Sequence, residues 1–197
     1  MATVVVVGGG YGGAAAAKAL DEIADVVLVE PKDAFVHNIA ALRGLVDPDW
    51  TERIFYPYDR LLRNGRVIHD RAARVDADAV ILGSGERIEA DYIVLASGSA
   101  YPFPAKMDAH DSNIAKSRIA NTRAELIKAQ RVLLLGAGPV GLELSGEIKA
   151  AWPDKAVTII DPIDDVLSGQ YSDAMRKDIR RQLEDLGVNL LLGTSLT

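Results

Sequence analysis

The 197-residue chain is 49% hydrophobic and 25% charged, which is typical of a soluble protein with a sizeable core. Its net charge of −6 argues against nucleic acid as a partner, because phosphate binding favours basic surfaces. The absence of cysteine excludes disulfides, thiolate nucleophiles and cysteine metal sites. No apolar run approaches the roughly 18–20 residues of a membrane span and no signal peptide is evident. We therefore expect a cytoplasmic protein and leave peripheral membrane contact open.

The first 30 residues predict a strand, a helix and a second strand. Thr3–Val7 is a run of mostly β-branched residues that ends at a group of glycines, as a buried parallel strand does. Gly13–Leu20 is rich in alanine and predicts a helix. Val26–Glu30 predicts the next strand, which Pro31 ends. Such a crossover should be right-handed.

The middle of the chain carries weaker signals. Residues 33–64 hold most of the aromatic side chains, and there we expect helices and loops. Residues 66–96 contain short β-like runs separated by turn signals and end in "DYIVLASGS", a further buried strand with a small-residue turn. We expect the crossover between domains within residues 99–130.

The plan of the first 30 residues then returns. Further elements are expected in the order strand, helix, strand, helix and strand, at Arg131–Leu135, Pro139–Ala151, Ala156–Ile160, Ser172–Leu186 and Val188–Leu192. Ser172 has the residue type of a helix N-cap, and Gly187 that of the position after a helix end.

A glycine fingerprint, G-x-G-x-x-G, joins the first strand to the first helix. Gly8 allows the tight turn, Gly10 lets the backbone approach a pyrophosphate, and Gly13 lets the helix pack on the strand. The phosphate would lie at the helix N-terminus. Glu30 ends the second strand, where an acid accepts hydrogen bonds from ribose hydroxyls. The alternative is a glycine-rich turn with an incidental exposed Glu30.

A second fingerprint, Gly136, Gly138 and Gly141, has the same context, with Asp161 at the end of its second strand. Two dinucleotide sites on one chain suggest two cofactors used together, FAD on the first unit and a nicotinamide on the second.

The acids that follow the second fingerprint predict whether this site prefers NADH or NADPH. Asp164 and Asp165 come soon after Asp161, and no Arg or Lys follows until Arg176. A 2′-phosphate would meet like charge, so we expect NADH to be preferred over NADPH.

These features predict an α/β fold with two Rossmann-like βαβ units on central parallel sheets. The first unit carries a short β-meander and the second is incomplete. The domains expected are an FAD-binding part at 1–105, a connection at 106–128 and an NAD(H)-binding part at 129–197.

The sequence resembles the two-dinucleotide-binding-domain flavoproteins, which belong to the pyridine nucleotide-disulfide oxidoreductase-like superfamily. It is most similar there to the family of the ferroptosis suppressor protein, or apoptosis-inducing factor 2. The resemblance covers the whole chain and rests on "VVVVGGGYGG", "VEPKDAFVHNIAALR", "DYIVLASGSAYPFPAK", "RVLLLGAGPVGLELSGEI" and "WPDKAVTIID".

The resemblance implies cofactor contacts at further positions. Those implied for FAD are Gly8, Gly9, Gly10, Tyr11, Gly12, Gly13, Glu30, Lys32, Arg43, Ala72, Ala96, Ser97 and Gly98. Those implied for the nicotinamide are Gly136, Gly138, Pro139, Val140, Gly141 and Asp161, with Glu143 as the acid beside the reacting ring. Taken without the resemblance, Arg43 could equally be a surface ion pair and Glu143 a solvated helix charge.

The family continues for about as long again, so the resemblance implies that this is its N-terminal half. Related disulfide reductases carry a redox cysteine pair, which this chain lacks. The activity implied is therefore an FAD-dependent oxidoreductase that takes hydride from NADH and passes electrons to a small molecule, a quinone; a homodimer is left open. Alternatives are another reductase of the superfamily, acting on ferredoxin or rubredoxin, and a truncated cofactor-binding module without turnover.

The remaining residues suggest no other chemistry. His69 and His110 have no partners at metal-ligand spacing, and we expect no metal. His37 is better explained as a packed or surface residue than as part of a flavin pocket.

Overall fold

The computed structural model describes residues 1–195 and divides the chain into two compact units, Met1–Asn38 with Glu52–Ser117 and Ile39–Thr51 with Arg118–Thr197. Residues 196 and 197, at the end of the predicted 129–197 domain, lie outside the described residues. The domain boundaries at 105 and 128 stay predictions. No helix in the described range combines the length and apolar character that crossing a membrane requires.

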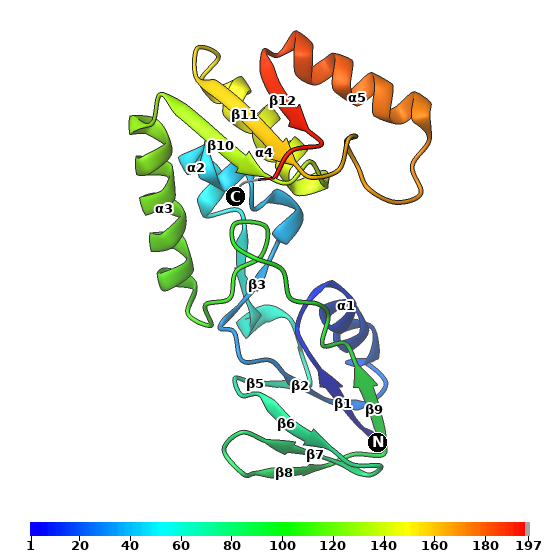
Figure 1. Ribbon diagram of the computed structural model, residues 1–197. Coiled ribbons are helices and arrows are strands. Elements are labelled where there is room, and N and C mark those ends of the chain that lie inside the picture. The colour runs from blue at the N-terminus through cyan, green and yellow to red at the C-terminus, as the bar shows by residue number, and fades with distance from the viewer. Residues whose placement is uncertain (196–197) are drawn as a thin grey trace. The chain divides into compact units, whose positions relative to one another are not determined.

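The first unit is built on a four-stranded parallel sheet (Figure 1). Its strand order is β5-β2-β1-β9, and α1 joins β1 to β2. The elements of this unit are β1 (Thr3–Val7), α1 (Tyr11–Leu20), β2 (Asp25–Val29), β3 (Ala34–Val36), β4 (Phe55–Pro57), β5 (Arg66–Ile68), β6 (Ala72–Val75), β7 (Ala79–Leu82), β8 (Arg87–Glu89) and β9 (Tyr92–Leu95).

The core of the first unit lies on both faces of this sheet. Alternate residues of β1 and β2, such as Val6 and Leu28, are buried in the cluster that includes Ala17 of α1. The residues between them pack against the antiparallel meander β6-β7-β8, where Val5 shares a cluster with Val80. Strands with both faces covered read as continuous apolar runs, which is why the sequence predicted this sheet well.

The second unit repeats the design with a parallel sheet in the order β10-β11-β12. Its α4 packs on β11 and buries Leu144 and Ile148, while α5 packs beside β12. The elements of this unit are α2 (Pro48–Thr51), β10 (Arg131–Leu135), α4 (Pro139–Ala151), β11 (Ala156–Asp161), α5 (Asp173–Asp185) and β12 (Val188–Leu192), with most of α3 (Ser112–Lys128).

The ends of α5 follow the predicted chemistry. The Ser172 hydroxyl accepts the Met175 N–H at 3.3 Å, as an N-cap does. Gly187, just after the helix, has φ +75°, a left-handed conformation that glycine adopts without strain.

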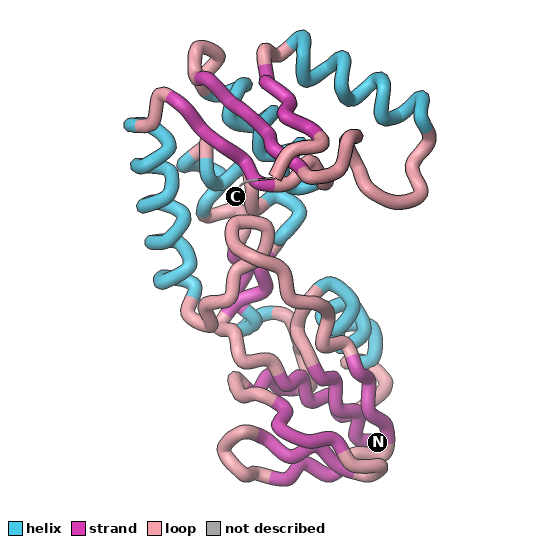
Figure 2. Tube along the Cα trace, in the orientation of Figure 1, coloured by secondary structure: helices cyan, strands magenta, loops and turns pink. Residues whose placement is uncertain are grey.

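Two parts of the fold differ from the prediction. Residues 33–64 are not only helices and loops: β3 and β4 form an antiparallel pair there, because strands of three residues are too short to show a two-residue period. Residues 106–128 contain α3, the long helix that is cyan in Figure 2. Its start had a signal that was missed, since the Asp111 carboxylate accepts the N–H groups of Asn113 and Ile114.

Candidate dinucleotide sites

The first glycine fingerprint forms the loop between β1 and α1. Gly8 has φ +100°, and a Cβ there would collide with the carbonyl of Ala96. A Cβ at Gly13 would run into the carbonyl of Gly8, so helix and strand meet here at backbone distance. Both glycines are therefore needed for the fold itself.

Gly10 differs from these two glycines. Its φ of −68° suits any residue, and a Cβ there would have nothing within 4 Å. The space beside Gly10 is thus open at the N-terminus of α1, where the first N–H groups have no partner within the helix. Tyr11 and Gly12, which are also predicted contacts, belong to this first turn. An open backbone cradle at a helix N-terminus fits the pyrophosphate of a dinucleotide.

Glu30 is buried directly after β2 and is bonded to the same loop. Its Oε2 accepts the Gly9 N–H at 2.6 Å, and its Oε1 accepts the Lys32 N–H at 3.0 Å. A carboxylate has about four acceptor positions, so these two bonds fix the carboxylate and leave capacity for a ribose hydroxyl.

A cavity of about 400 Å³ opens beside this loop. The predicted contacts among its lining residues are Gly8, Glu30, Lys32, Ala72 and Ser97. Ala96 and Gly98 flank Ser97 in the turn after β9, and Gly98 has φ +69°. The structure thus gathers at one cavity residues that lie far apart in the sequence.

Two cations of this cavity were not among the predicted contacts. Arg71 and Lys106 line it together with Lys32, and the Lys106 ammonium donates to the Ser99 carbonyl at 2.5 Å and hydroxyl at 2.7 Å. Two acids, Glu30 and Asp108, also line the cavity, so the cations outnumber the acids and the lining suits an anionic ligand. Only the fold brings these cations together, so no spacing in the sequence could have revealed them.

The second fingerprint reproduces the first. Gly136 has φ +108°, and a Cβ at Gly141 would collide with the carbonyl of Gly136. A Cβ at Gly138 would have nothing within 4 Å. Pro139 begins α4, a position that needs no N–H donor, and Val140 follows it in the first turn.

Asp161 does in the second unit what Glu30 does in the first. Its Oδ2 accepts the Ala137 N–H at 2.7 Å and its Oδ1 accepts the Ile163 N–H at 2.8 Å. In both units the acid at the end of the second strand thus binds the residue after the first glycine. The repeated sequence motif therefore forms the same hydrogen bond in both units.

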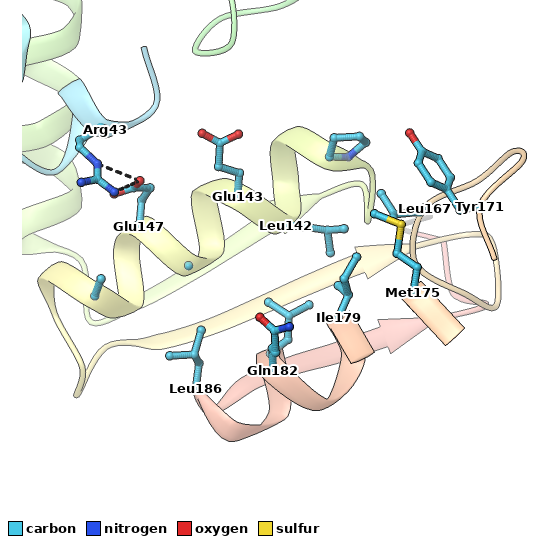
Figure 3. Close-up of a pocket in the computed structure, with 14 residues that line it drawn as sticks. Arg43, Leu142, Glu143, Glu147, Leu167, Tyr171, Met175, Ile179, Gln182 and Leu186 are labelled. Carbon is cyan, nitrogen blue, oxygen red and sulfur yellow. Dashed lines mark hydrogen bonds and ion pairs between the residues drawn. The ribbon is translucent and has the colours of Figure 1, made fainter. Parts of the chain in front are cut away.

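Glu143 lies on the exposed side of α4 (Figure 3). Although the side chain reaches solvent, neighbouring groups remove part of the water around the Glu143 carboxyl. This desolvation, followed by the charge of Glu147 one turn later, raises the pKa of the carboxyl, and Arg43 opposes the rise. The second turn of α4 therefore holds an acid whose ionised form is disfavoured by its surroundings.

Arg43 forms an ion pair. Its Nε and Nη2 donate to Glu147 Oε1 at 3.0 and 2.8 Å (Figure 3), and its guanidinium lies 5.6 Å from the centre of the Trp50 ring. Arg43 thus makes an ion pair, which was the alternative to a contact with FAD. Its contact with FAD stays a prediction.

A groove of about 500 Å³ separates α4 from α5 (Figure 3). Leu142, Leu167, Ile179 and Leu183 line it, and Glu143 and Glu147 stand at its α4 side. No local pattern in the sequence predicts this groove, because its two walls come from helices that β11 and a long loop separate.

The histidines and acids of the described residues form no group that could hold a metal ion. His37 is engaged with Tyr11, whose hydroxyl lies 2.8 Å from the His37 Nδ1. His37 thus has a partner that belongs to the first turn of α1.

Comparison with known proteins gives a consistent assignment. The model of the pyridine nucleotide-disulphide oxidoreductase family matches residues 2–197. Ferroptosis suppressor protein 1 of Taeniopygia guttata is 34% identical over 98% of this chain and 53% of its own length. Apoptosis-inducing factor homolog B of Dictyostelium discoideum is 30% identical over 98% of this chain and 52% of its own. The chain thus spans about half the length of these curated relatives.

The fold agrees with this assignment. The reductase in the covalent putidaredoxin reductase–putidaredoxin complex superposes with a TM-score of 0.76 at 21% identity, over all of this chain and 51% of that one.

Proposed function

Because the chain belongs to the pyridine nucleotide-disulphide oxidoreductase family, we propose that it is the part of an FAD-dependent oxidoreductase that binds both dinucleotides. FAD binds at the first fingerprint and NADH at the second. The observation that carries this proposal is the repeated loop, in which an acid holds the peptide after the first glycine and the second glycine faces open space.

FAD is assigned to the first site on the charge of its cavity and on the family pattern. Lys32, Arg71 and Lys106 offer positive charge to a pyrophosphate, and Glu30 offers acceptor capacity to the adenosine ribose. When bound, FAD supplies the chemistry of accepting a hydride from NADH. The chain supplies binding and orientation.

NADH rather than NADPH is assigned to the second site on charge. Asp161 and Asp164 would repel a 2′-phosphate. The nearest cations on α5 are committed to the loop after β11: Arg180 donates to Asp165 Oδ1 and to the Asp164 carbonyl, both at 2.8 Å. Arg176 donates to the Val166 carbonyl at 2.9 Å. Both guanidinium groups are thus hydrogen-bonded to this loop.

The proposed electron acceptor is a quinone. This chain has no cysteine that could form a redox disulfide, which suits direct transfer from the flavin to a small acceptor, and the resemblance to the ferroptosis suppressor family favours a quinone.

Absorption spectroscopy tests the proposed function. We expect the purified protein, reconstituted with FAD, to show a flavin spectrum that NADH bleaches under anaerobic conditions and that a soluble quinone then restores. A protein that binds no flavin, or bound flavin that NADH leaves oxidised, would contradict the proposal. Bleaching that a quinone cannot reverse would retain the two cofactors and reject the acceptor.

A further inference from the structure

The peptide group on each side of Gly9 is held by a different side chain. The Gly9 N–H donates to Glu30 Oε2 at 2.6 Å, and the Gly9 carbonyl accepts the Tyr58 hydroxyl at 2.8 Å. A Cβ added at Gly9 would lie 2.5 Å from the Tyr58 Oη and 2.9 Å from the Glu30 Cγ. Gly9 is thus enclosed by the two groups that bind it.

The bond to the Gly9 carbonyl fixes the direction of the next N–H. In a trans peptide the C=O of one residue and the N–H of the next point in opposite directions. Because the Gly9 carbonyl faces Tyr58, the Gly10 N–H faces away from Tyr58. Gly10 is the residue beside the open cradle at the start of α1, where a pyrophosphate would accept such a donor.

Tyr58 is well suited to this role. It is only 4% exposed and is packed in the core cluster that contains Val6 and Leu28, so its ring has little freedom to move. Burial, with the charges of Glu30 and Asp33, raises the pKa of its hydroxyl. A tyrosine hydroxyl is already protonated at neutral pH, and the raised pKa keeps it a donor at more alkaline pH as well.

The second unit satisfies the corresponding carbonyl by another route. Ala137 occupies the place of Gly9, its N–H donates to Asp161, and its carbonyl accepts the Leu167 N–H at 2.9 Å. Leu167 adopts φ +55°, which is unfavourable for a leucine. Two unrelated donors, a tyrosine hydroxyl and a strained backbone N–H, thus bind the same carbonyl of the repeated loop. This recurrence indicates that the orientation of the peptide matters.

We propose that Tyr58 is a positioning residue for FAD, which acts through the Gly9 carbonyl to aim the Gly10 N–H at the pyrophosphate. This inference rests on the proposed function, because it assumes that FAD occupies the first site. It adds a residue that the fingerprint does not contain and that reaches the fingerprint loop through the Gly9 carbonyl.

Replacing the hydroxyl alone tests the role. We expect Tyr58→Phe, which keeps the buried ring, to weaken FAD binding about tenfold, or about 1.4 kcal/mol, in a fluorescence titration of the apoprotein. Tyr56→Phe is the matched control, since Tyr56 lies two residues away and is 52% exposed. It should bind FAD like the wild type. Binding of NADH at the second site should be unchanged in both variants.

Phosphorus NMR separates positioning from a general effect on folding. A lost N–H contact should move the ³¹P resonance of one phosphate of bound FAD in Tyr58→Phe and not in Tyr56→Phe. Gly9→Ala provides a second route if Tyr58→Phe does not fold, because its methyl group would push the Tyr58 hydroxyl away from Gly9. Since the methyl group would also meet Glu30, only weaker binding together with a shift of a single phosphate resonance supports the role of Tyr58 in this variant. Gly9→Ala should also bind FAD at least tenfold more weakly.

The outcomes distinguish this inference from the proposed function. Wild-type FAD affinity in folded Tyr58→Phe or Gly9→Ala would overturn the positioning role and leave the FAD site intact. Weaker binding with an unmoved ³¹P spectrum would also overturn it, because Tyr58 would then be only structural. A wild-type protein that binds no FAD would overturn both proposals.

Discussion

At the scale of single residues, Glu143 is the side chain whose position most invites a chemical role. It lies in the second turn of α4, two residues after the last glycine of the second fingerprint. A carboxylate there can hydrogen-bond the carboxamide or ribose of a nicotinamide and orient the ring, and orientation of this kind can contribute several kcal/mol.

We expect Glu143→Ala to slow flavin reduction by NADH about tenfold, or about 1.4 kcal/mol of barrier. Glu143→Gln keeps the size and should fall between Ala and the wild type. FAD content should be unchanged in both variants, because the first fingerprint is untouched. Stopped-flow bleaching of the flavin measures the effect, and wild-type rates in the Ala variant would return Glu143 to the class of solvated helix charges.

The ionised carboxyl of Glu143 should lower the stability of the folded protein at neutral pH. Its pKa is raised in the folded state, chiefly by burial and then by Glu147, so ionisation destabilises the fold relative to the unfolded chain. We expect Glu143→Gln to raise the melting temperature slightly at pH 7, with a gain that fades as the pH falls and the wild-type carboxyl is protonated. Thermal denaturation between pH 4 and 8 measures this. A gain that does not depend on pH would reject the electrostatic explanation.

At the scale of elements, Asp21 joins the end of α1 to the segment before β5. Its carboxylate accepts the N–H groups of Arg63 at 2.6 Å and Gly65 at 2.7 Å, and that of Asn64 at longer distances. These bonds lower the pKa of Asp21, the bond from Arg63 most. A single side chain thus accepts three backbone N–H groups of the loop, in place of the backbone carbonyls that would accept them in a helix or a sheet.

We expect Asp21→Ala to lower the melting temperature by several degrees at pH 7, because three backbone donors lose their partner. An acid with a lowered folded pKa stabilises the fold above its unfolded pKa of about 3.9, and this contribution is lost as the pH falls through the folded value. The difference between wild type and variant should therefore shrink in acid. An equal difference at pH 7 and pH 2 would contradict this account.

The loop after β11 carries the prediction on nucleotide preference. Asp161→Ser combined with Asp164→Arg should shift the kcat/KM ratio from NADH toward NADPH, because a repelling acid is removed and a cation is added. Replacing Asp164 alone with Asn is the control for loss of charge without a new cation. A wild-type enzyme that uses both nucleotides equally would reject the assignment.

Many of the strands and helices could be predicted from the sequence, and some could not. The strands of both fingerprints were predicted to within one residue at each end, because buried parallel strands and glycine turns have strong local signals. The pair β3 and β4 and the helix α3 were missed, since neither has a clear period.

For the candidate site, the sequence could predict only some of the residues. Glycines and terminal acids could be identified because the backbone demands them locally. Tyr58, Arg71 and Lys106 reach the first loop or its cavity only through the tertiary fold, so no spacing in the sequence could identify them.

At the scale of the whole molecule, the chain uses one device twice. Each unit has a parallel sheet, a fingerprint loop, an acid bonded to that loop and an open second glycine. The two sites differ in what surrounds them: three cations line the cavity of the first, and acids follow the second. We propose that these are two independent sites for two different dinucleotides.

Valine substitutions at Gly10 and at Gly138 test whether the two sites are independent. A Cβ at Gly10 or at Gly138 would meet no protein atom within 4 Å, and neither residue has a positive φ, so valine should clash mainly with a bound dinucleotide. Gly146→Ala serves as the control, since Gly146 is also open and lies outside both loops.

The measurement is the binding stoichiometry of FAD and of NADH in each variant, by titration of the folded protein. We expect one FAD and one NADH to bind in the wild type and in Gly146→Ala, Gly10→Val to lose FAD alone, and Gly138→Val to lose NADH alone. Normal FAD binding in folded Gly10→Val, or loss of the same cofactor from both valine variants, would contradict the proposal.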